Sequence, residues 1–344
     1  MRNWIRKIIG MLVLVLFLSQ LSAVPAAATE PVETVPVTTP VKEETQPPET
    51  EPEASETLQH TYEIDTESEI YKACEEIYDQ LKCDQILVYD PDNDEILYAY
   101  SREGDKLYPA STTKLFSAYV ALQYLKTDDV ITEGEELDLV EPGSSLAYLK
   151  KGNKLYVTML IEAMMLPSGN DAAVVTSVAA GRKIAGDDQL EPEKAVQAFV
   201  AEMNRMAKEL GFEKTHFSNP DGFHLGSHYT CMNDMARIAK LALETPVIAY
   251  HMWKFEDEVT FFSGQTAKWK NTNLFLDPEN DFYRSDAIGM KTGFTRQAQY
   301  CLMSAFNCGG GRKLVIGAFG SANEYDRLRD INKLMKVIKP LYKK

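Results

Sequence analysis

The chain has 344 residues, of which 44% are hydrophobic and 10% aromatic, and this composition is enough to build a sizeable core. Its formal net charge is −15, from 51 acidic and 36 basic residues. A protein this acidic repels polyanions, so its composition argues against nucleic acid as a partner and mainly favours solubility.

The first 28 residues have the three parts of a secretory signal peptide. Arg2, Arg6 and Lys7 precede an apolar run over 8–24, and a small-residue stretch ends at Ala28. We expect cleavage after Ala28. The alternative is an uncleaved anchor helix, because the apolar run is close to the length that spans a bilayer. In both cases we expect the rest of the chain outside the cytoplasm, in the cell wall or at the outer face of the cytoplasmic membrane.

Residues 29–60 are dominated by Pro, Glu and Thr and contain almost no large apolar side chains. Such a segment cannot bury enough surface to offset the entropy lost on ordering, so we predict a disordered, extended linker. Residues 61–344 contain no second linker and are predicted to form one catalytic domain. Only about fifty residues follow Gly293, so we expect no separate C-terminal β domain.

The hydrophobic pattern of residues 61–344 predicts strands at both ends and helices between them. In chain order we first expect a helix over Glu69–Leu81, a hairpin of Gln85–Tyr89 and Glu95–Tyr100, and a long helix from Ala110 through Leu125. Mostly helical structure follows over 157–243, with loops at 181–191 and 219–227. The chain then forms strands Tyr300–Phe306 and Leu314–Phe319 and a final helix carrying Ile331, Leu334, Met335 and Ile338.

This order predicts an α+β fold, in which an antiparallel sheet is flanked by helices and carries an inserted helical subdomain. The final helix also carries several lysines, so a membrane-surface role is an alternative. A helix that packs on the core and exposes a basic face explains the same pattern more simply.

The five cysteines are few for a disulfide-stapled protein, and their number is odd. We interpret them as buried thiols. Bridges Cys301–Cys308 or Cys74–Cys83 remain alternatives. Neither a Cys-x-x-Cys pair nor a Cys/His cluster has the spacing of metal ligands, so we expect neither a metal nor another cofactor.

The first chemical motif is Ser111-Thr112-Thr113-Lys114 at the start of the long predicted helix. Positions i and i+3 share a helix face, so the hydroxyl of Ser111 and the amine of Lys114 can meet. Serine becomes a strong nucleophile when a neighbour takes its proton, and a buried lysine can do so if its pKa is lowered. The alternative is an ordinary helix start capped by Ser111.

Two further motifs follow. In Ser168-Gly169-Asn170, a hydroxyl and an amide on a turn can relay a proton and hold a substrate amide, although helix capping explains these residues cheaply. In Lys291-Thr292-Gly293, a cation, a hydroxyl and a glycine on a strand can bind a carboxylate at close range. The alternative for the latter is an exposed lysine before a bend.

The order Ser-x-x-Lys, then Ser-Gly-Asn, then Lys-Thr-Gly behind an export signal is typical of penicillin-binding proteins and class A β-lactamases. Over residues 65–335 the chain resembles the low-molecular-weight D-alanyl-D-alanine carboxypeptidases, a family of serine peptidases. The segments that carry the resemblance are PASTTK, LPSGNDAA, FVAEMNRMAKELGFEKTHFSNPDGFH, HYTCMNDMARIAKLA and IGMKTGFTRQAQYCLMSAF.

The resemblance implies roles for the motif residues. Ser111 would attack the carbonyl between two terminal D-alanines, with Lys114 as general base. Ser168 and Lys291 would pass the proton to the leaving amine, and Asn170 would orient the substrate amide.

By the same resemblance, the N–H groups of Ser111 and Phe294 would form an oxyanion hole. Thr292 and Lys291 would bind the substrate carboxylate where Gly293 lets it approach, with Arg327 as a second cation. The alternative for Arg327 is a surface helix arginine paired with Asp326 or Asp330. The expected partners are peptidoglycan stem peptides ending in D-Ala-D-Ala, with β-lactam antibiotics as covalent inhibitors. Membrane association is left open.

Three other functions use similar motifs. A D,D-endopeptidase acting on cross-linked stems needs the same groups and differs only in the shape of its pocket. A class A β-lactamase also needs a deacylating glutamate, for which Glu202 is a weak candidate because its segment has a helical pattern. A non-catalytic β-lactam or peptidoglycan sensor is disfavoured by the complete set of motifs.

Overall fold

Six strands form one antiparallel sheet in a computed structural model that describes residues 62–102 and 104–342. The predicted signal peptide and linker lie outside these residues. The strand order is β2, β1, β10, β9 and β7, and β8 pairs with β9 on the same edge as β7. The strands are β1 (Gln85–Asp90), β2 (Glu95–Ser101), β7 (Ala287–Gly289), β8 (Thr292–Thr295), β9 (Gln299–Gly309) and β10 (Arg312–Ser321).

Both faces of this sheet are covered. In β1, Leu87 and Tyr89 belong to the core shared with the helical insert, while Ile86 and Val88 belong to a second core on the opposite face. Side chains of a strand alternate between faces, so an almost continuously apolar strand is what a two-sided core requires.

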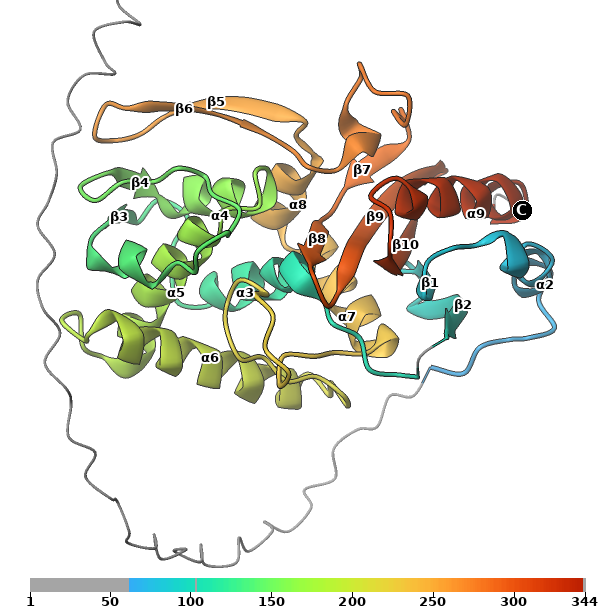
Figure 1. Ribbon diagram of the computed structural model, residues 1–344, viewed down its shortest axis with the longest axis horizontal. Helices are drawn as coiled ribbons and strands as arrows, with labels where there is room; N and C mark the ends of the chain where they lie inside the picture. The colour runs from blue at the N-terminus through green and yellow to red at the C-terminus, as the bar shows by residue number, and fades with distance from the viewer. Residues whose placement is uncertain (1–61, 103, 343–344) are drawn as a thin grey trace, which may run out of the picture. The chain divides into compact units, whose positions relative to one another are not determined.

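The second core is closed by α2 (Glu69–Glu75) and α9 (Asp326–Tyr342), which lie against each other and against the sheet (Figure 1). Leu334 and Ile338 of α9 are completely buried there. The core-packing interpretation of the last helix is therefore confirmed. The predicted helix Glu69–Leu81 is too long, because α2 ends at Glu75 and a separate 3₁₀ turn, Tyr78–Gln80, follows.

The helical insert lies between β2 and β7 and surrounds α3 (Figure 1). Its helices are α3 (Lys114–Ala121), α4 (Val157–Met165), α5 (Asn170–Ala185), α6 (Pro192–Glu209), α7 (Met232–Glu244) and α8 (Pro246–Trp253). Two predicted boundaries are wrong: α3 ends before Leu125, and α5 continues through Gly181 to Ala185. At Gly181 a Cβ would lie 1.9 Å from the carbonyl oxygen of Ala195, so this glycine lets α5 and α6 pack closely.

Two small hairpins complete the insert and were not predicted. They are β3 (Val130–Thr132) with β4 (Lys154–Tyr156), and β5 (Glu256–Thr260) with β6 (Thr266–Lys270). The turn of the second hairpin is joined to β4 by a hydrogen bond from Phe262 N to Lys154 O, 2.7 Å.

All five cysteines are free and buried, so the alternatives of a Cys301–Cys308 or Cys74–Cys83 bridge are wrong. Within residues 62–102 and 104–342, we find no helix with the length and apolar character needed to cross a bilayer. The predicted α+β class, with an antiparallel sheet, flanking helices and a helical insert, is confirmed. The edge strand β8 lies against the 3₁₀ turn Ala110–Thr113, which precedes α3, and this junction holds the candidate site.

Candidate active site

Ser111 lies in a 3₁₀ turn, Ala110–Thr113 (η2), that leads directly into α3. The sequence predicted an α-helix at this point. In the tighter 3₁₀ turn, side chains three residues apart eclipse each other. The turn therefore brings the Nζ atom of Lys114 to 2.9 Å from the Oγ atom of Ser111.

Lys114 is completely buried and is held by three oxygen atoms. Besides Ser111 Oγ, its Nζ donates to Asn170 Oδ1 at 2.6 Å and to the carbonyl oxygen of Asp221 at 2.8 Å. Burial lowers the pKa of Lys114 to about 8, although the charges of Asp221 and Asp171 oppose this shift. With that pKa, roughly a tenth of the amine is neutral at pH 7. A neutral amine at this distance can accept the hydroxyl proton.

The turn at Ser168 faces the same cavity as Ser111. Ser168 has a φ of 64°, a left-handed conformation that costs a non-glycine residue roughly 1–3 kcal/mol. Asn170 Nδ2 donates to Ser144 Oγ at 2.9 Å, while its Oδ1 accepts from Lys114. Neither Ser168 nor Asn170 caps α5, so the capping alternative is wrong.

Asp171 fixes the loop around Ser144 and Ala147, which forms another wall of the cavity that Ser111 faces. Its carboxylate accepts hydrogen bonds from Ala147 N at 2.9 Å and Leu149 N at 3.0 Å. A Cβ on Gly169 would lie 2.9 Å from the Cβ of Ala147, so only glycine allows this close approach. The loop that carries Ser144 is thereby attached to the start of α5.

The Lys291–Gly293 segment approaches the nucleophile from the sheet. The backbone of Lys291 pairs with Met303 of β9 (N to O 3.1 Å and 2.9 Å), just after Met290, which has a φ of 106°. A Cβ on Gly293 would lie 2.9 Å from the backbone nitrogen of Ser111. A side chain here would push β8 away from η2, so the glycine explains how strand and nucleophile share one cavity.

Lys291 is fully buried, so the alternative of an exposed strand-end lysine is wrong. Its Nζ donates to Thr292 O at 3.0 Å. Burial, reinforced by the positive charges of Lys114 and Arg327, lowers the pKa of Lys291 well below its usual value. Thr292 shares a hydrogen bond of 2.5 Å with Thr272, which the sequence did not single out.

Arg327 is buried rather than on the surface, so its surface alternative is also wrong. Its Nη1 atom donates to Cys301 O at 2.7 Å and to Gly293 O at 3.4 Å. Its only ion pair with a described residue is to Glu324, at 3.7 Å. Its Nε atom is buried without a partner in the part of the chain described here. The guanidinium therefore places a poorly compensated positive charge beneath β8.

The loop 219–224, which the sequence indicated only as a loop, forms a further wall. Its carbonyl at Asp221 holds Lys114, and Gly222 touches the nucleophile turn. Gly222 has a φ of 83°, and a Cβ there would lie 1.8 Å from the carbonyl oxygen of Ala110, itself at a φ of 47°. The Asn-Pro-Asp-Gly sequence at 219–222 is the turn signal that could have indicated this role.

His228 connects this loop to the nucleophile turn. Burial lowers its pKa to about 3, so the ring is neutral. Ser218 N donates to Nδ1 at 3.1 Å, which leaves the hydrogen on Nε2, 2.9 Å from Thr113 Oγ1. Thr113 Oγ1 in turn donates to Ala110 O at 2.8 Å. The chain of hydrogen bonds holds the turn before Ser111 in its left-handed conformation.

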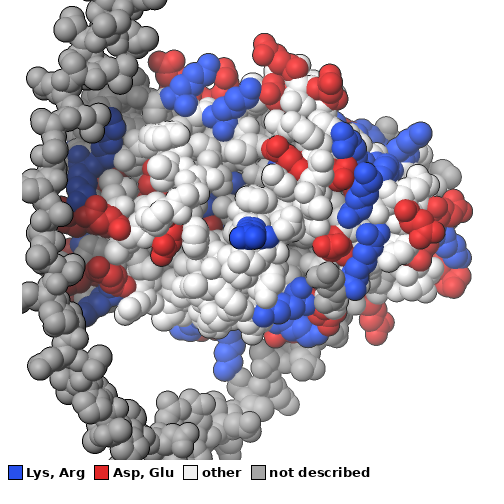
Figure 2. Space-filling model, in the orientation of Figure 1, with Lys and Arg blue, Asp and Glu red and all other residues white. Residues whose placement is uncertain are grey.

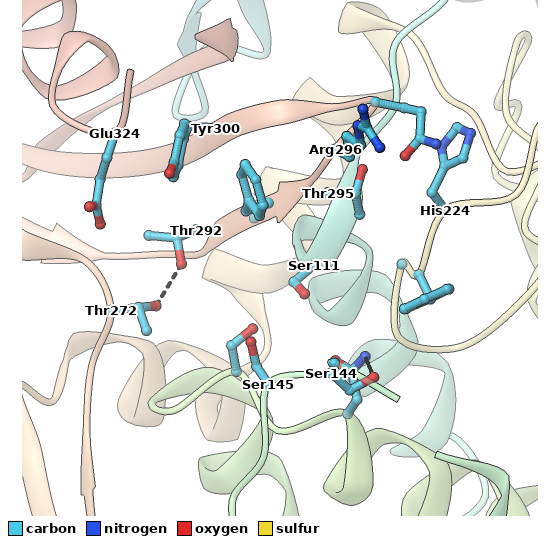
Figure 3. A pocket seen from close by; sticks show the side chains of 18 of the residues that line it. Ser111, Ser144, Ser145, His224, Thr272, Thr292, Thr295, Arg296, Tyr300 and Glu324 are labelled. Atoms are coloured by element: carbon cyan, nitrogen blue, oxygen red, sulfur yellow. Dashed lines mark hydrogen bonds between the residues drawn. The ribbon is translucent and has the colours of Figure 1, made fainter. Parts of the chain in front are cut away.

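These groups meet in a cavity of about 710 Å³ (Figure 3). Seven of the nine predicted site residues line it, while Lys114 and Lys291 lie beneath its surface. The lining residues that the sequence did not single out include Ser144, Ser145, Thr272, Tyr300 and Glu324. On the face shown in Figure 2, most charged side chains lie toward the edges, and a basic side chain stands out in an otherwise largely uncharged middle.

Glu202, the weak β-lactamase candidate, is not part of this cavity. It lies on α6, where it pairs with Arg205 and with the hydroxyl of Tyr124. In residues 62–102 and 104–342, no group of three or more His, Cys, Asp or Glu side chains could hold a metal ion.

A serine hydroxyl beside a partly neutral lysine, in a cavity with buried cations at one end, defines a site for acyl transfer through serine on a substrate that carries a carboxylate. The model of the D-alanyl-D-alanine carboxypeptidase family matches residues 72–320. This chain therefore belongs to the D-alanyl-D-alanine carboxypeptidase family of serine peptidases.

Known proteins of this kind are similar along most of the domain. D-alanyl-D-alanine carboxypeptidase DacF of Bacillus subtilis is 29% identical over 264 residues, or 74% of this chain, and the chain spans 62% of its length. The solved DD-transpeptidase of Streptomyces K15 has a TM-score of 0.65 at 27% identity, covering 75% of this chain and 97% of that one. Penicillin-binding protein D2 of Listeria monocytogenes, solved with ampicillin bound, has a TM-score of 0.59 at 26% identity over the same shares.

Proposed function

We propose that the chain is a serine D-Ala-D-Ala carboxypeptidase, which removes the terminal D-alanine from peptidoglycan stem peptides through an acyl-enzyme on Ser111. The observation that carries the proposal is the meeting of Ser111, Lys114, the Ser168–Asn170 turn and the Lys291–Gly293 strand at one cavity. Membership of the family supports the same reaction.

In the acylation step, the Oγ of Ser111 attacks the carbonyl carbon of the penultimate D-alanine and its proton moves to the Nζ of Lys114. The negative charge that develops on the carbonyl oxygen is bound by the N–H groups of Ser111 and Phe294. A donor of this kind is worth about 10²–10³ in rate. The contact of Gly293 with the backbone of Ser111 supports this pair, because Phe294 follows directly on the same strand.

In the second half, the bond between the carbonyl carbon and the leaving nitrogen breaks. The proton passes by way of Ser168 and Lys291 to that nitrogen, and D-alanine departs. Water then attacks the ester on Ser111 and gives a proton to Lys114. As the bond between the acyl carbon and Oγ breaks, Lys114 returns that proton to Ser111 Oγ and the shortened peptide leaves. Asn170 orients the substrate amide, and its own position is fixed by Lys114 and Ser144.

The terminal carboxylate of the substrate binds at Thr292 and Gly293, above Lys291 and Arg327. Two buried cations and the paired hydroxyls of Thr292 and Thr272 support this placement. A β-lactam carries a carboxylate and a strained amide in a similar arrangement, so it would acylate Ser111 and remain as a slowly hydrolysed ester.

The predicted export of the domain suits this substrate, since peptidoglycan lies outside the cytoplasmic membrane. Residues 1–28 as a signal peptide and 29–60 as a linker remain sequence predictions. The domain itself, predicted as 61–344, would then act in the cell wall or at the outer face of the membrane.

The reaction is tested by mass spectrometry of a pentapeptide ending in D-Ala-D-Ala. We expect the peptide to lose one alanine residue, and the same peptide ending in L-Ala to remain intact. A cross-linked stem dimer in a parallel incubation measures endopeptidase activity. Cleavage of the dimer alone would replace carboxypeptidase by endopeptidase as the main activity, and cleavage of neither would reject the proposed function.

The pH dependence should follow the amine of Lys114. Only the neutral amine can take the serine proton, and burial moves its pKa from 10.5 to about 8. The value of kcat/KM should therefore rise about tenfold per pH unit on the acid side and level off near pH 8. A pH series of D-alanine release at limiting substrate measures this curve. A midpoint near the ordinary lysine value would contradict the assignment of Lys114 as the base.

A further inference from the structure

The cavity has two ends with Ser111 between them. Thr292, Tyr300 and Glu324 lie toward one end, and Arg296 and His224 toward the other (Figure 3). Arg327 underlies the first end, where its Nη1 atom donates to the carbonyl of Gly293, so its positive charge favours the terminal carboxylate there. If the leaving D-alanine occupies that end, as the proposed function requires, the rest of the peptide must extend toward Arg296.

Arg296 is an exposed guanidinium on the wall of this second end. Its side chain makes no ion pair or hydrogen bond with any residue in the described ranges, and only its carbonyl is engaged, by Gln299 Nε2 at 2.5 Å. The turn that carries it is well fixed, because Ala298 N donates to Thr295 Oγ1 at 3.0 Å. The backbone that carries this cation is therefore fixed, while the guanidinium itself has no partner in the described ranges.

No carboxylate lines the cavity at the end that carries Arg296. Among the residues that line the cavity, Glu324 is the only carboxylate, and it lies at the opposite end. His224 forms the facing wall, with its ring against Tyr108 at 4.9 Å. The ammonium of Lys106 lies 5.1 Å from the Tyr108 ring. Burial, reinforced by the positive charge of Lys106, lowers the pKa of His224. With the charges of Arg296 and Lys106 and no lining carboxylate nearby, this end of the cleft favours a negative charge.

Distance along the strand identifies which part of the substrate meets Arg296. Gly293 touches the nucleophile turn, and an extended peptide on β8 advances about 3.3 Å per residue. The residue before the penultimate D-alanine then lies beside Thr295 and Arg296. In a stem peptide this third residue is a diamino acid, whose side chain ends either in an amine alone, as in lysine, or in an amine and a carboxylate, as in diaminopimelate.

We propose that Arg296 binds the side-chain carboxylate of the third residue of the stem, so that the enzyme prefers diaminopimelate-containing stems to lysine-containing stems. A planar guanidinium can bind a carboxylate through two hydrogen bonds, and it repels an unaccompanied ammonium. The inference rests on the proposed function, since it concerns the same cleft and the same substrate.

The test compares three acyl-X-D-Ala-D-Ala peptides in which X is diaminopimelate, diaminopimelate amidated on its side-chain carboxylate, or lysine. We expect the wild-type kcat/KM to be about fivefold higher for the free carboxylate than for the other two, in the range of a partly exposed ion pair. The preference should decrease as salt is added.

Arg296→Gln should reduce the preference to near one, by lowering kcat/KM for the free diaminopimelate peptide alone. Arg296→Glu should make lysine the preferred residue. Lys126→Gln removes an exposed positive charge outside the cavity and should leave the wild-type preference intact.

Hydrolysis of all three peptides with ratios that Arg296→Gln does not change would overturn the assignment of Arg296 while leaving the carboxypeptidase activity in place. An equal loss on all three peptides would do the same, because it indicates a general effect on the cleft. Failure of the wild-type enzyme to release D-alanine from any of them would instead reject the proposed function, and this inference with it.

Discussion

Ser111→Ala should lower D-alanine release by at least about 10⁴-fold and abolish the penicillin adduct. In the wild-type enzyme the Oγ atom of Ser111 lies beside Lys114. Without this activated nucleophile no acyl-enzyme can form. The measurements are mass spectrometry of the peptide and of the penicillin-treated protein, with peptide mapping of the adduct.

The substitution should leave the fold intact. Among the described residues the hydroxyl of Ser111 takes part in one hydrogen bond, which it accepts from Lys114, so the free energy of unfolding should change by only about 1 kcal/mol. Ser263→Ala, at the β5–β6 turn and outside the residues that line the cavity, serves as the control and should release D-alanine at the wild-type rate. Substantial D-alanine release by a folded Ser111→Ala enzyme would show that another group is the nucleophile.

Lys114→Met should lower the acylation rate by about 10³–10⁴-fold, because methionine keeps the length of the side chain but cannot take a proton. The rate is measured as the appearance of a fluorescent penicillin on Ser111 in stopped flow. Deacylation of any adduct that forms should be slow as well, since the same amine serves the attacking water.

The Lys114→Met substitution should change the free energy of unfolding far less than it changes the acylation rate. Methionine leaves Asn170 Oδ1 and Asp221 O without their donor, which costs roughly 1–3 kcal/mol for each atom. It also removes a buried amine whose desolvation is unfavourable, which offsets part of that cost. Lys126→Met is the exposed control. A wild-type acylation rate in folded Lys114→Met would move the role of base to the second buried amine, Lys291.

Motif spacing predicted the chemistry of the site better than its shape. Ser111 and Lys114 are three residues apart, so any helical turn brings them together, and the prediction holds although the turn is 3₁₀. Strands β1, β2, β9 and β10 were predicted because their apolar runs are long and lie between clear turn signals, whereas the three-residue β7 was missed. The final helix was predicted from its apolar spacing, which matches the core that it closes.

The sequence patterns could not predict contacts between residues that lie far apart in the chain. Arg327 carries the pattern of a surface helix residue, and only the packing of α9 under β9 brings it to Cys301 and Gly293. Thr272 and Glu324 belong to irregular segments without a motif, so nothing local indicates that they reach the cavity. The hairpins β3–β4 and β5–β6 were missed because their strands are short and half-exposed.

The left-handed residues of the site have one more consequence. Ala110, Ser168 and Met290 each adopt a positive φ, and each stands at or immediately before one of the three motifs. Such conformations persist only where surrounding packing imposes them, so the reacting groups are already in place in the empty enzyme. A site that is preorganised in this way does not have to rearrange when a ligand binds. We therefore expect a rigid fused-ring lactam to fit this site as readily as the flexible end of the peptide. The same preorganisation that favours the peptide reaction would make the enzyme sensitive to the antibiotic.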